Sequence, residues 1–306
     1  MRMRIETSAR RLATAATVLV CVVAATALGA ACASARRAPV TSAPVTAGSG
    51  YLALGDSVSF GYQEPQVVPA PDYLKSSSFL GFPEQLASEL HLTLANASCP
   101  GETSASLVNA NAQSNGCENA ARGMPPIAYR KLFPLHVSYT GSQLAFAVSY
   151  LRAHPGVRLV SLMIGANDAF VCQETTADKC ASLLEQAALQ SRISGNVRRI
   201  LTAIRDTAHY RGQVAIVNYF STDYASPTID ALSHALNRIQ DTAAKPFHVV
   251  IADGYGEWQA ATARAGGSSC TAGLLTQLRT GKCGIHPTYA GQALLAEALL
   301  KAIRVG

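Results

Sequence analysis

Residues 158–168 read RLVSLMIGAND, a run that is apolar on both faces and then meets a polar loop. Residues 51–57, YLALGDS, have the same form. A strand that is apolar on both faces must be covered on both sides, as strands of parallel sheets are. Further strands are expected at 92–94, 213–219 and 247–252, and helices at 82–90, 142–153, 181–210, 229–243 and 289–303. This alternation predicts a parallel α/β sheet with helices on both faces.

Polar residues follow the predicted strands at their carboxyl ends. Ser57, Asn167 and Asp253 each come directly after such a strand or within a short loop of it. Open parallel sheets bind ligands beyond the carboxyl ends of their strands. Residues 109–140 lack a regular pattern and contain three prolines, so we expect a long surface excursion near this edge.

The first residues carry four arginines, then an apolar run at 12–28, then small residues at 29–35. This order is typical of a secretory signal peptide. We therefore predict a signal peptide at 1–33, a flexible linker at 34–49, one folded domain at 50–306 and a secreted protein. A retained anchor and lipid attachment at Cys32 are the alternatives, because Gly29-Ala30-Ala31-Cys32 loosely matches a lipoprotein signal.

The net charge gives little sign of a polyanionic partner. The formal charge of +6 includes the arginines of the leader, and residues 34–306 carry 21 basic and 18 acidic side chains. Their Lys and Arg are scattered, whereas nucleic-acid-binding domains gather them on one face. We expect no nucleic-acid partner.

Six of the eight cysteines lie beyond the leader, and an even number in an exported chain indicates disulfides. The spacing favours neighbouring pairs: Cys99 with Cys117, Cys172 with Cys180, and Cys270 with Cys283. There is no C-x-x-C or paired-histidine spacing of the kind that zinc sites use. We expect neither a metal nor a cofactor.

Four short motifs occur in a fixed order along most of the chain: Gly55-Asp56-Ser57-Val58-Ser59, Cys99-Pro100-Gly101-Glu102-Thr103, Gly165-Ala166-Asn167-Asp168 and His286-Pro287. Together they resemble the SGNH or GDSL hydrolase superfamily, in particular secreted actinobacterial lipases and esterases. The resemblance implies a three-layer, flavodoxin-like α/β/α domain with about five parallel strands. It also implies hydrolysis of a small-molecule or lipid ester. We further expect a monomer and contact with a membrane or cell-wall surface.

The resemblance assigns a role to each motif. Ser57 is the expected nucleophile and His286 the general base. An acyl transfer also needs donors aimed at the developing oxyanion, and the candidates are the N–H groups of Ser57 and Gly101 and Nδ2 of Asn167. Asp56 and Asp168 are expected to brace their loops rather than to form a pair of catalytic carboxylates.

One position departs from the family pattern. Many relatives carry an Asp three residues before the catalytic His, where this chain has Cys283. A bridged sulfur cannot orient an imidazole, so we expect a backbone carbonyl near residues 280–283 to hold His286 Nδ1. Asp253, at the end of the preceding strand, is the alternative.

Two other functions remain open from the sequence. A carbohydrate or peptidoglycan O-acetylesterase would use the same residues with a smaller acyl pocket. A non-catalytic cell-envelope binding protein would keep the fold without the reaction, since fold alone does not determine function.

Overall fold

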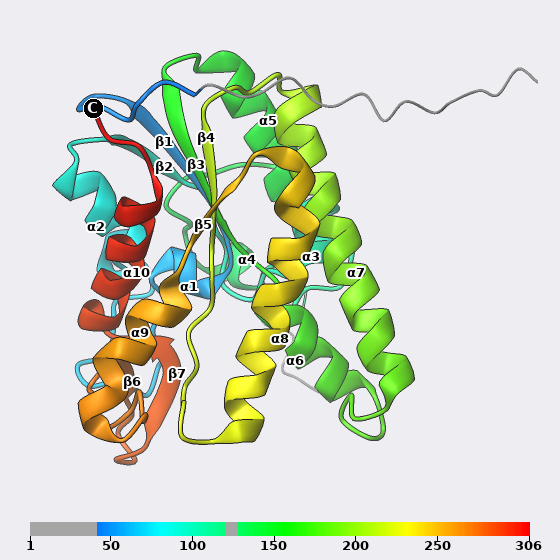
Figure 1. The fold of residues 1–306 in the computed structure, drawn as a ribbon, viewed down its shortest axis with the longest axis vertical. Helices are drawn as coiled ribbons and strands as arrows, with labels where there is room; N and C mark the ends of the chain where they lie inside the picture. Colours follow the sequence, from blue (N-terminus) through cyan, green and yellow to red (C-terminus); the bar gives the residue numbers. More distant parts are fainter. Residues whose placement is uncertain (1–41, 120–127) are drawn as a thin grey trace, which may run out of the picture. The chain divides into compact units, whose positions relative to one another are not determined.

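The computed structural model describes residues 42–119 and 128–306, which belong to one compact unit. At its centre is a five-stranded sheet in the order β2-β1-β3-β4-β5, and every neighbouring pair is parallel (Figure 1). The strands are β1 (Gly50–Gly55), β2 (Thr93–Asn96), β3 (Val157–Met163), β4 (Gln213–Val217) and β5 (Val250–Ala252). The predicted parallel sheet of about five strands is therefore confirmed.

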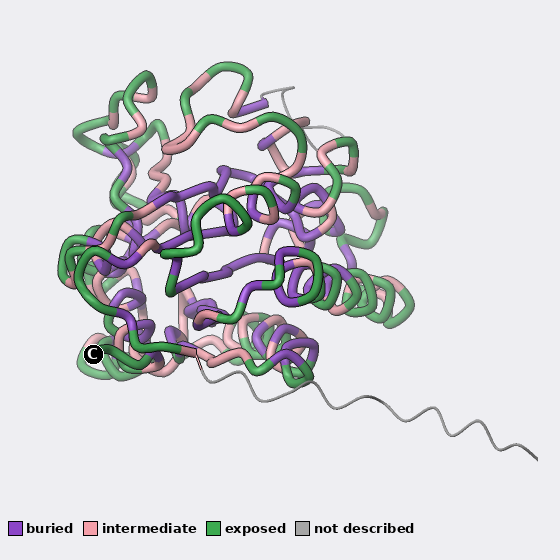
Figure 2. The backbone as a smooth tube through the Cα atoms, turned by 90° about the horizontal axis from the view of Figure 1, so that it is seen from above, coloured by how far each residue is buried: buried purple, intermediate pink, exposed green. Residues whose placement is uncertain are grey.

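Each face of the sheet is covered by its own group of helices (Figure 1). In β1, Leu52 and Leu54 pack toward one group, and Tyr51 and Ala53 toward the other, because successive side chains point to opposite faces. The first group comprises α3 (Ser104–Val108), α5 (Gln143–Ala153), α7 (Leu183–Thr202) and α8 (Pro227–Ala244). The second comprises α2 (Phe82–Glu89), α9 (Gly254–Thr262) and α10 (Tyr289–Ala302). Figure 2 shows the buried strands between helices whose outer sides are exposed, which is the expected three-layer α/β/α arrangement.

The remaining elements lie in the connections. They are α1 (Ser57–Phe60), α4 (Tyr129–Leu132), α6 (Ala166–Thr175) and an antiparallel hairpin of β6 (Leu275–Gln277) and β7 (Cys283–Pro287). Short 3-10 turns occur at Ser76–Ser78, Lys245–Phe247 and Ala263–Ala265, and a π-helical turn at Ala203–Thr207 continues α7. The hairpin was not predicted, since its strands are short and mostly polar.

The folded part begins before the predicted boundary at Gly50. Val45 is fully buried, its N–H donates to the carbonyl of Arg304 (2.9 Å), and its carbonyl accepts from Gly306 N (3.0 Å). Residues 45–49 are thus part of the domain rather than of a linker. The error has a clear cause, because the pairing joins segments about as far apart in sequence as the described residues allow. The predicted signal peptide and Cys32 lie outside the described residues.

Disulfides join the three neighbouring cysteine pairs that the spacing favours. The Cα–Cα distances are 5.8 Å for Cys99–Cys117, 5.5 Å for Cys172–Cys180 and 5.8 Å for Cys270–Cys283. Within residues 42–119 and 128–306, no helix is long and apolar enough to cross a membrane.

Candidate active site

Ser57 stands at a sharp turn between β1 and α1. Gly55, the last residue of β1, has φ +143°, and a Cβ there would lie 2.3 Å from the carbonyl oxygen of Met163. Asp56 caps α1, because its Oδ1 accepts a hydrogen bond from Val58 N (3.0 Å). Its Oδ2 accepts a second hydrogen bond, from the Tyr219 hydroxyl. Burial raises the pKa of Asp56 to about 6, although both hydrogen bonds act in the opposite direction. Asp56 therefore braces the turn, as expected, and does not face the cleft as a second carboxylate.

His286, on β7, reaches the serine from the other end of the chain. Its Nε2 lies 2.9 Å from Ser57 Oγ, a hydrogen-bonding distance. The side chain is 12% exposed, so most of it is shielded from solvent. The Cys270–Cys283 disulfide fastens the hairpin three residues before His286. The two residues predicted to act together are thus brought together.

Glu64 holds the other ring nitrogen of His286. Its Oε1 lies 2.9 Å from His286 Nδ1 and also accepts from Ile285 N at 2.8 Å, while Oε2 accepts from the Thr276 hydroxyl at 2.6 Å. Burial acts to raise the pKa of Glu64, but the hydrogen bond and charge of His286, with the Thr276 and Ile285 bonds, lower it to about 2. Glu64 is therefore an ionised carboxylate at ordinary pH.

The expected imidazole partners are not where the sequence reasoning placed them. No carbonyl of residues 280–283 bonds to His286 Nδ1, and Asp253 caps α9 by accepting from Gly256 N at 2.9 Å. Glu64 was missed because it lies only seven residues after the nucleophile, whereas the usual acid lies three residues before the catalytic His. It reaches His286 because its loop lies along the hairpin, where Arg279 N donates to Gln66 O (2.7 Å).

The three predicted oxyanion donors lie on segments that are fastened to one another. Gly101 has φ +81°, in the left-handed region, and its carbonyl accepts from Asn115 N at 2.7 Å. Asn167, at the start of α6, accepts from Asn115 Nδ2 at 2.9 Å through its Oδ1. Within the described part of the chain, the N–H groups of Ser57 and Gly101 and Nδ2 of Asn167 donate to no other group. They remain free to bind a developing oxyanion.

Asp168 joins the third motif to the second. Its carboxylate accepts from both the N–H and the hydroxyl of Ser104, each at 2.7 Å. Ser104 begins α3, three residues after Gly101. Asp168 thus has the bracing role predicted for it.

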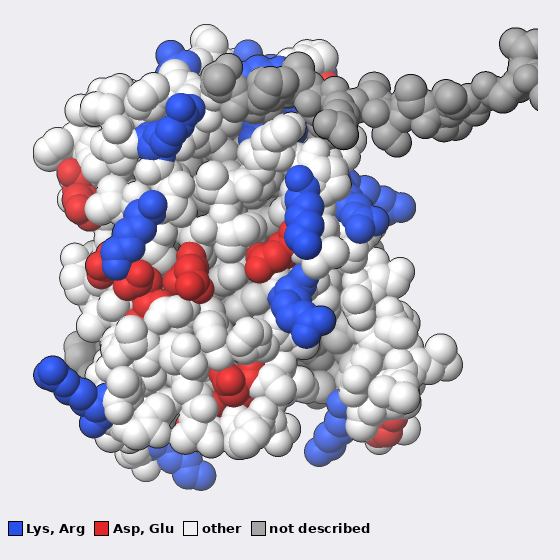
Figure 3. Space-filling model, in the orientation of Figure 1, with Lys and Arg blue, Asp and Glu red and all other residues white. Residues whose placement is uncertain are grey.

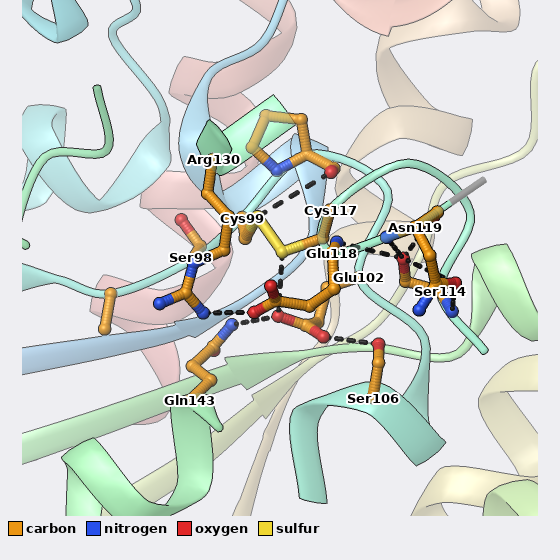
Figure 4. Close-up of a disulfide and its surroundings, with 12 residues drawn as sticks. Ser98, Cys99, Glu102, Ser106, Ser114, Cys117, Glu118, Asn119, Arg130 and Gln143 are labelled. Carbon is orange, nitrogen blue, oxygen red and sulfur yellow. Dashed lines mark hydrogen bonds and ion pairs between the residues drawn. A yellow bond between two sulfur atoms is a disulfide. The ribbon is translucent and has the colours of Figure 1, made fainter. Parts of the chain in front are cut away.

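Glu102 and Gln143 form a buried cluster beside the Cys99–Cys117 disulfide (Figure 4). Gln143 accepts from Gly55 N (2.6 Å) and donates to Gly55 O (3.0 Å) and to Glu102 Oε2 (3.1 Å). Burial raises the pKa of Glu102 to about 8, against hydrogen bonds from Ser106 and Gln143 that lower it. Cys99, Glu102 and Cys117 lie close enough for a metal site, but the bridged sulfurs are not thiolates.

An aromatic cluster packs against the imidazole of His286. The Tyr62 ring meets the imidazole edge-on, with centroids 4.9 Å apart, and contacts Phe79 and Tyr129 on its other sides. Tyr129 belongs to the irregular stretch at 109–140, and Asn115 of the same stretch contacts Asn167. The described residues Asn115 and Tyr129 of this stretch therefore lie beside the site. On the face drawn in Figure 3, Lys and Arg are dispersed among acidic and uncharged side chains.

A family model, described as the GDSL-like lipase/acylhydrolase family, matches residues 53–294 and so covers Ser57, Gly101, Asn167 and His286. The chain belongs to this family. Among solved structures, the acylhydrolase is similar to Axe2, an acetylxylan esterase from Geobacillus stearothermophilus, at 14% identity. That alignment has a TM-score of 0.50 and covers 85% of this chain and 96% of Axe2.

A catalytic mutant of Axe2 gives a TM-score of 0.51 at 14% identity, covering 86% of this chain and 98% of that one. LAE5, an α/β hydrolase from the metagenome of Lake Arreo, gives 0.49 at 15% identity, covering 84% and 96%. A comparison with the curated proteins finds no match. At these identities the Axe2 structures support the fold of the acylhydrolase alone.

Proposed function

We propose that this acylhydrolase hydrolyses carboxylic esters through an acyl-enzyme on Ser57, with His286 as general base and Glu64 as the residue that orients it. The observation that carries the proposal is the continuous chain from Ser57 Oγ to His286 Nε2 (2.9 Å) and from His286 Nδ1 to Glu64 Oε1 (2.9 Å). A nucleophile, a base within hydrogen-bond reach and a third group that orients the base are the recurring parts of serine hydrolases.

The geometry supports the following course of reaction. Ser57 Oγ attacks the ester carbonyl while His286 Nε2 takes its proton, and the carboxylate of Glu64 stabilises the imidazolium that forms. The carbonyl oxygen, now negative, accepts from Ser57 N, Gly101 N and Asn167 Nδ2. His286 then returns the proton to the departing alcohol. Water, activated by the same imidazole, releases the acid and restores Ser57.

The segments that carry His286 and Glu64 favour an apolar substrate. Ile285 is 50% exposed beside His286, and Val68 and Leu74 are 65% and 73% exposed on the loop that follows Glu64. Exposed aliphatic side chains on these two segments would offer apolar surface to an acyl chain. On this ground we propose a lipid or medium-chain ester, rather than an acetylated sugar, as the substrate. A panel of esters from acetyl to longer acyl chains decides between them, because an O-acetylesterase would turn over acetyl esters fastest.

We also propose that the enzyme is exported and acts as a monomer. Three disulfides in the described residues support the first part, since such bonds persist in oxidising compartments. The mass of the mature N-terminus tests the predicted cleavage after Ala33 against lipid attachment at Cys32.

Replacing the nucleophile tests the proposal. Ser57→Ala should lower kcat on an activated ester by roughly 10⁴–10⁶, as loss of a serine nucleophile does elsewhere. Ser77→Ala, at an exposed position on the 62–81 loop, is the matched control and should leave kcat unchanged. A fluorophosphonate should label wild type at Ser57 and not label the Ser57→Ala variant. Near-wild-type activity in that variant, or labelling elsewhere, would refute the mechanism, and no reaction at all would favour a binding protein.

A further inference from the structure

Asn115 contacts two of the three segments that carry the oxyanion donors. Its backbone N–H donates to the carbonyl of Gly101 (2.7 Å), and its Nδ2 donates to Oδ1 of Asn167 (2.9 Å). Its own Oδ1 is buried and accepts no hydrogen bond within the described residues. Of the two polar atoms of this side chain, Nδ2 alone has a hydrogen-bond partner within the described residues, and that partner is Asn167. Buried polar atoms without partners are rare and tend to be retained at functional sites.

The contact matters because a primary amide has a donor end and an acceptor end of nearly the same size. The Asn167 amide can face the cleft in two orientations that fill the same space. With Nδ2 toward the substrate it donates to the developing oxyanion. With Oδ1 toward the substrate it places a second partial negative charge against that oxyanion. A donor on the far side of the amide favours the first orientation, and Asn115 Nδ2 is such a donor.

We infer that Asn115 is a positioning residue that fixes the Asn167 amide in its catalytic orientation. Its hydrogen bond to the Gly101 carbonyl also positions the Gly101 N–H, the second oxyanion donor. This inference rests on the proposed ester hydrolysis. The contact with Gly101 is close, because a Cβ at Gly101 would lie 2.3 Å from the carbonyl oxygen of Asn115. The Cys99–Cys117 disulfide, two residues after Asn115, fastens this loop to the Gly101 segment.

Two substitutions at Asn115 separate positioning from simple structural support. Asn115→Asp keeps the shape but offers only acceptors, so it draws Asn167 Nδ2 away from the substrate. We expect kcat to fall by about 10²–10³, the usual effect of losing one oxyanion donor, with KM within about twofold. Asn115→Ala removes the contact and leaves the amide free to turn, so kcat should fall by about tenfold or less. A residue that only supports the loop would give the reverse order, because Ala removes more of the side chain than Asp.

A double-mutant cycle shows whether the effect passes through Asn167. Asn167→Ala alone should lower kcat by about 10²–10³, and adding Asn115→Asp should lower it by less than about threefold more. If the added charge acted directly on the oxyanion, the two losses would multiply, and the inference would be wrong. Asn111→Asp, an exposed change on the same loop, is the control and should have no effect.

The failures of the two proposals are distinguishable. If Ser57→Ala retains activity, the proposed function fails before Asn115 is tested. If Ser57→Ala and Asn167→Ala lose activity but Asn115→Asp does not, the inference alone is overturned. Should Asn115→Asp not fold, Asn115→Ala decides the question. A two- to tenfold loss in kcat, matched by weaker binding of a trifluoromethyl ketone that forms an oxyanion on Ser57, supports the inference, and no change in either overturns it.

Discussion

Two irregular segments carry the partners of Ser57 and are fastened by different contacts. The base segment comprises the loop at 62–81 and the β6–β7 hairpin, and an ionised carboxylate, Glu64, joins them. The oxyanion segment comprises residues 99–117. Two amide side chains join it to its neighbours, because Asn115 bonds to Asn167 and Gln143 links Glu102 to Gly55. The buried carboxyl group of Asp168 also joins it, through Ser104. Each segment also carries its own disulfide.

The difference follows the charge that each side must stabilise. Positive charge develops on His286, and an anion beside it lowers the energy of the imidazolium. Negative charge develops near Gly101 and Asn167, where an anion would raise the energy of the transition state. The two carboxyl groups beside these donors, Glu102 and Asp168, are buried, and burial raises the pKa of both, that of Glu102 to about 8. Burial therefore disfavours the charged form of both groups.

Substitution of Glu64 should give the largest effect of the variants that follow. Glu64→Ala leaves His286 Nδ1 without a partner, and we expect kcat to fall by roughly 10³–10⁴, as for other triad acids. Glu64→Gln should lose less, about 10–10³, because Oε1 can stay on the imidazole while Nε2 faces Thr276. Steady-state kinetics on an activated ester measures both.

Asp253→Asn serves as the control for Glu64 and should change kcat by less than tenfold. A thousandfold loss in folded Asp253→Asn, with Glu64→Ala near wild type, would return the orienting role to Asp253. Thermal melts of each variant show whether the hairpin stays folded.

The disulfides should differ in what they do for activity. Replacing Cys270 and Cys283 by Ser, or Cys172 and Cys180 by Ser, should lower stability by about 2–4 kcal/mol in either case. Only the first pair holds the hairpin of His286, so only its loss should also reduce kcat, by about tenfold. Urea unfolding and kinetics below the transition measure the two quantities, and equal kcat losses would contradict the distinction.

Glu102 should give the smallest effect, on the pH dependence of stability. Its pKa in the folded chain, about 8, lies above its ordinary value of 4.5, so the folded state holds a proton that the unfolded state releases. The stabilising contribution of protonated Glu102 is therefore full below about pH 4.5 and is lost as pH rises through 8. Glu102→Gln should flatten the decline in melting temperature between pH 5 and pH 8. An unchanged decline would mean that Asp56 or Glu84 accounts for it.

Short-range patterns predicted most of the fold, and long-range contacts limited the rest. Strand β3 was predicted because its residues are apolar on both faces, and Ser57, Asn167 and His286 could be placed because their motifs are local. The role of Glu64 and the hairpin could not be predicted in this way. Both depend on contacts between the loop at 62–81 and a segment more than 200 residues away in sequence. Val45 was missed for the same reason, because nothing near it in sequence signals its pairing with residue 305.

That pairing has a practical consequence for anyone handling the enzyme. Val45 and Val305 form a parallel bridge, so the first described residues and the last lie together at the amino edge of the sheet, opposite the catalytic mouth. An affinity tag, a fluorophore or a solid support joined after Gly306 would be attached at this edge and would leave the edge that carries Ser57 facing the solvent. Immobilised in that way, the enzyme should keep its turnover on dissolved esters.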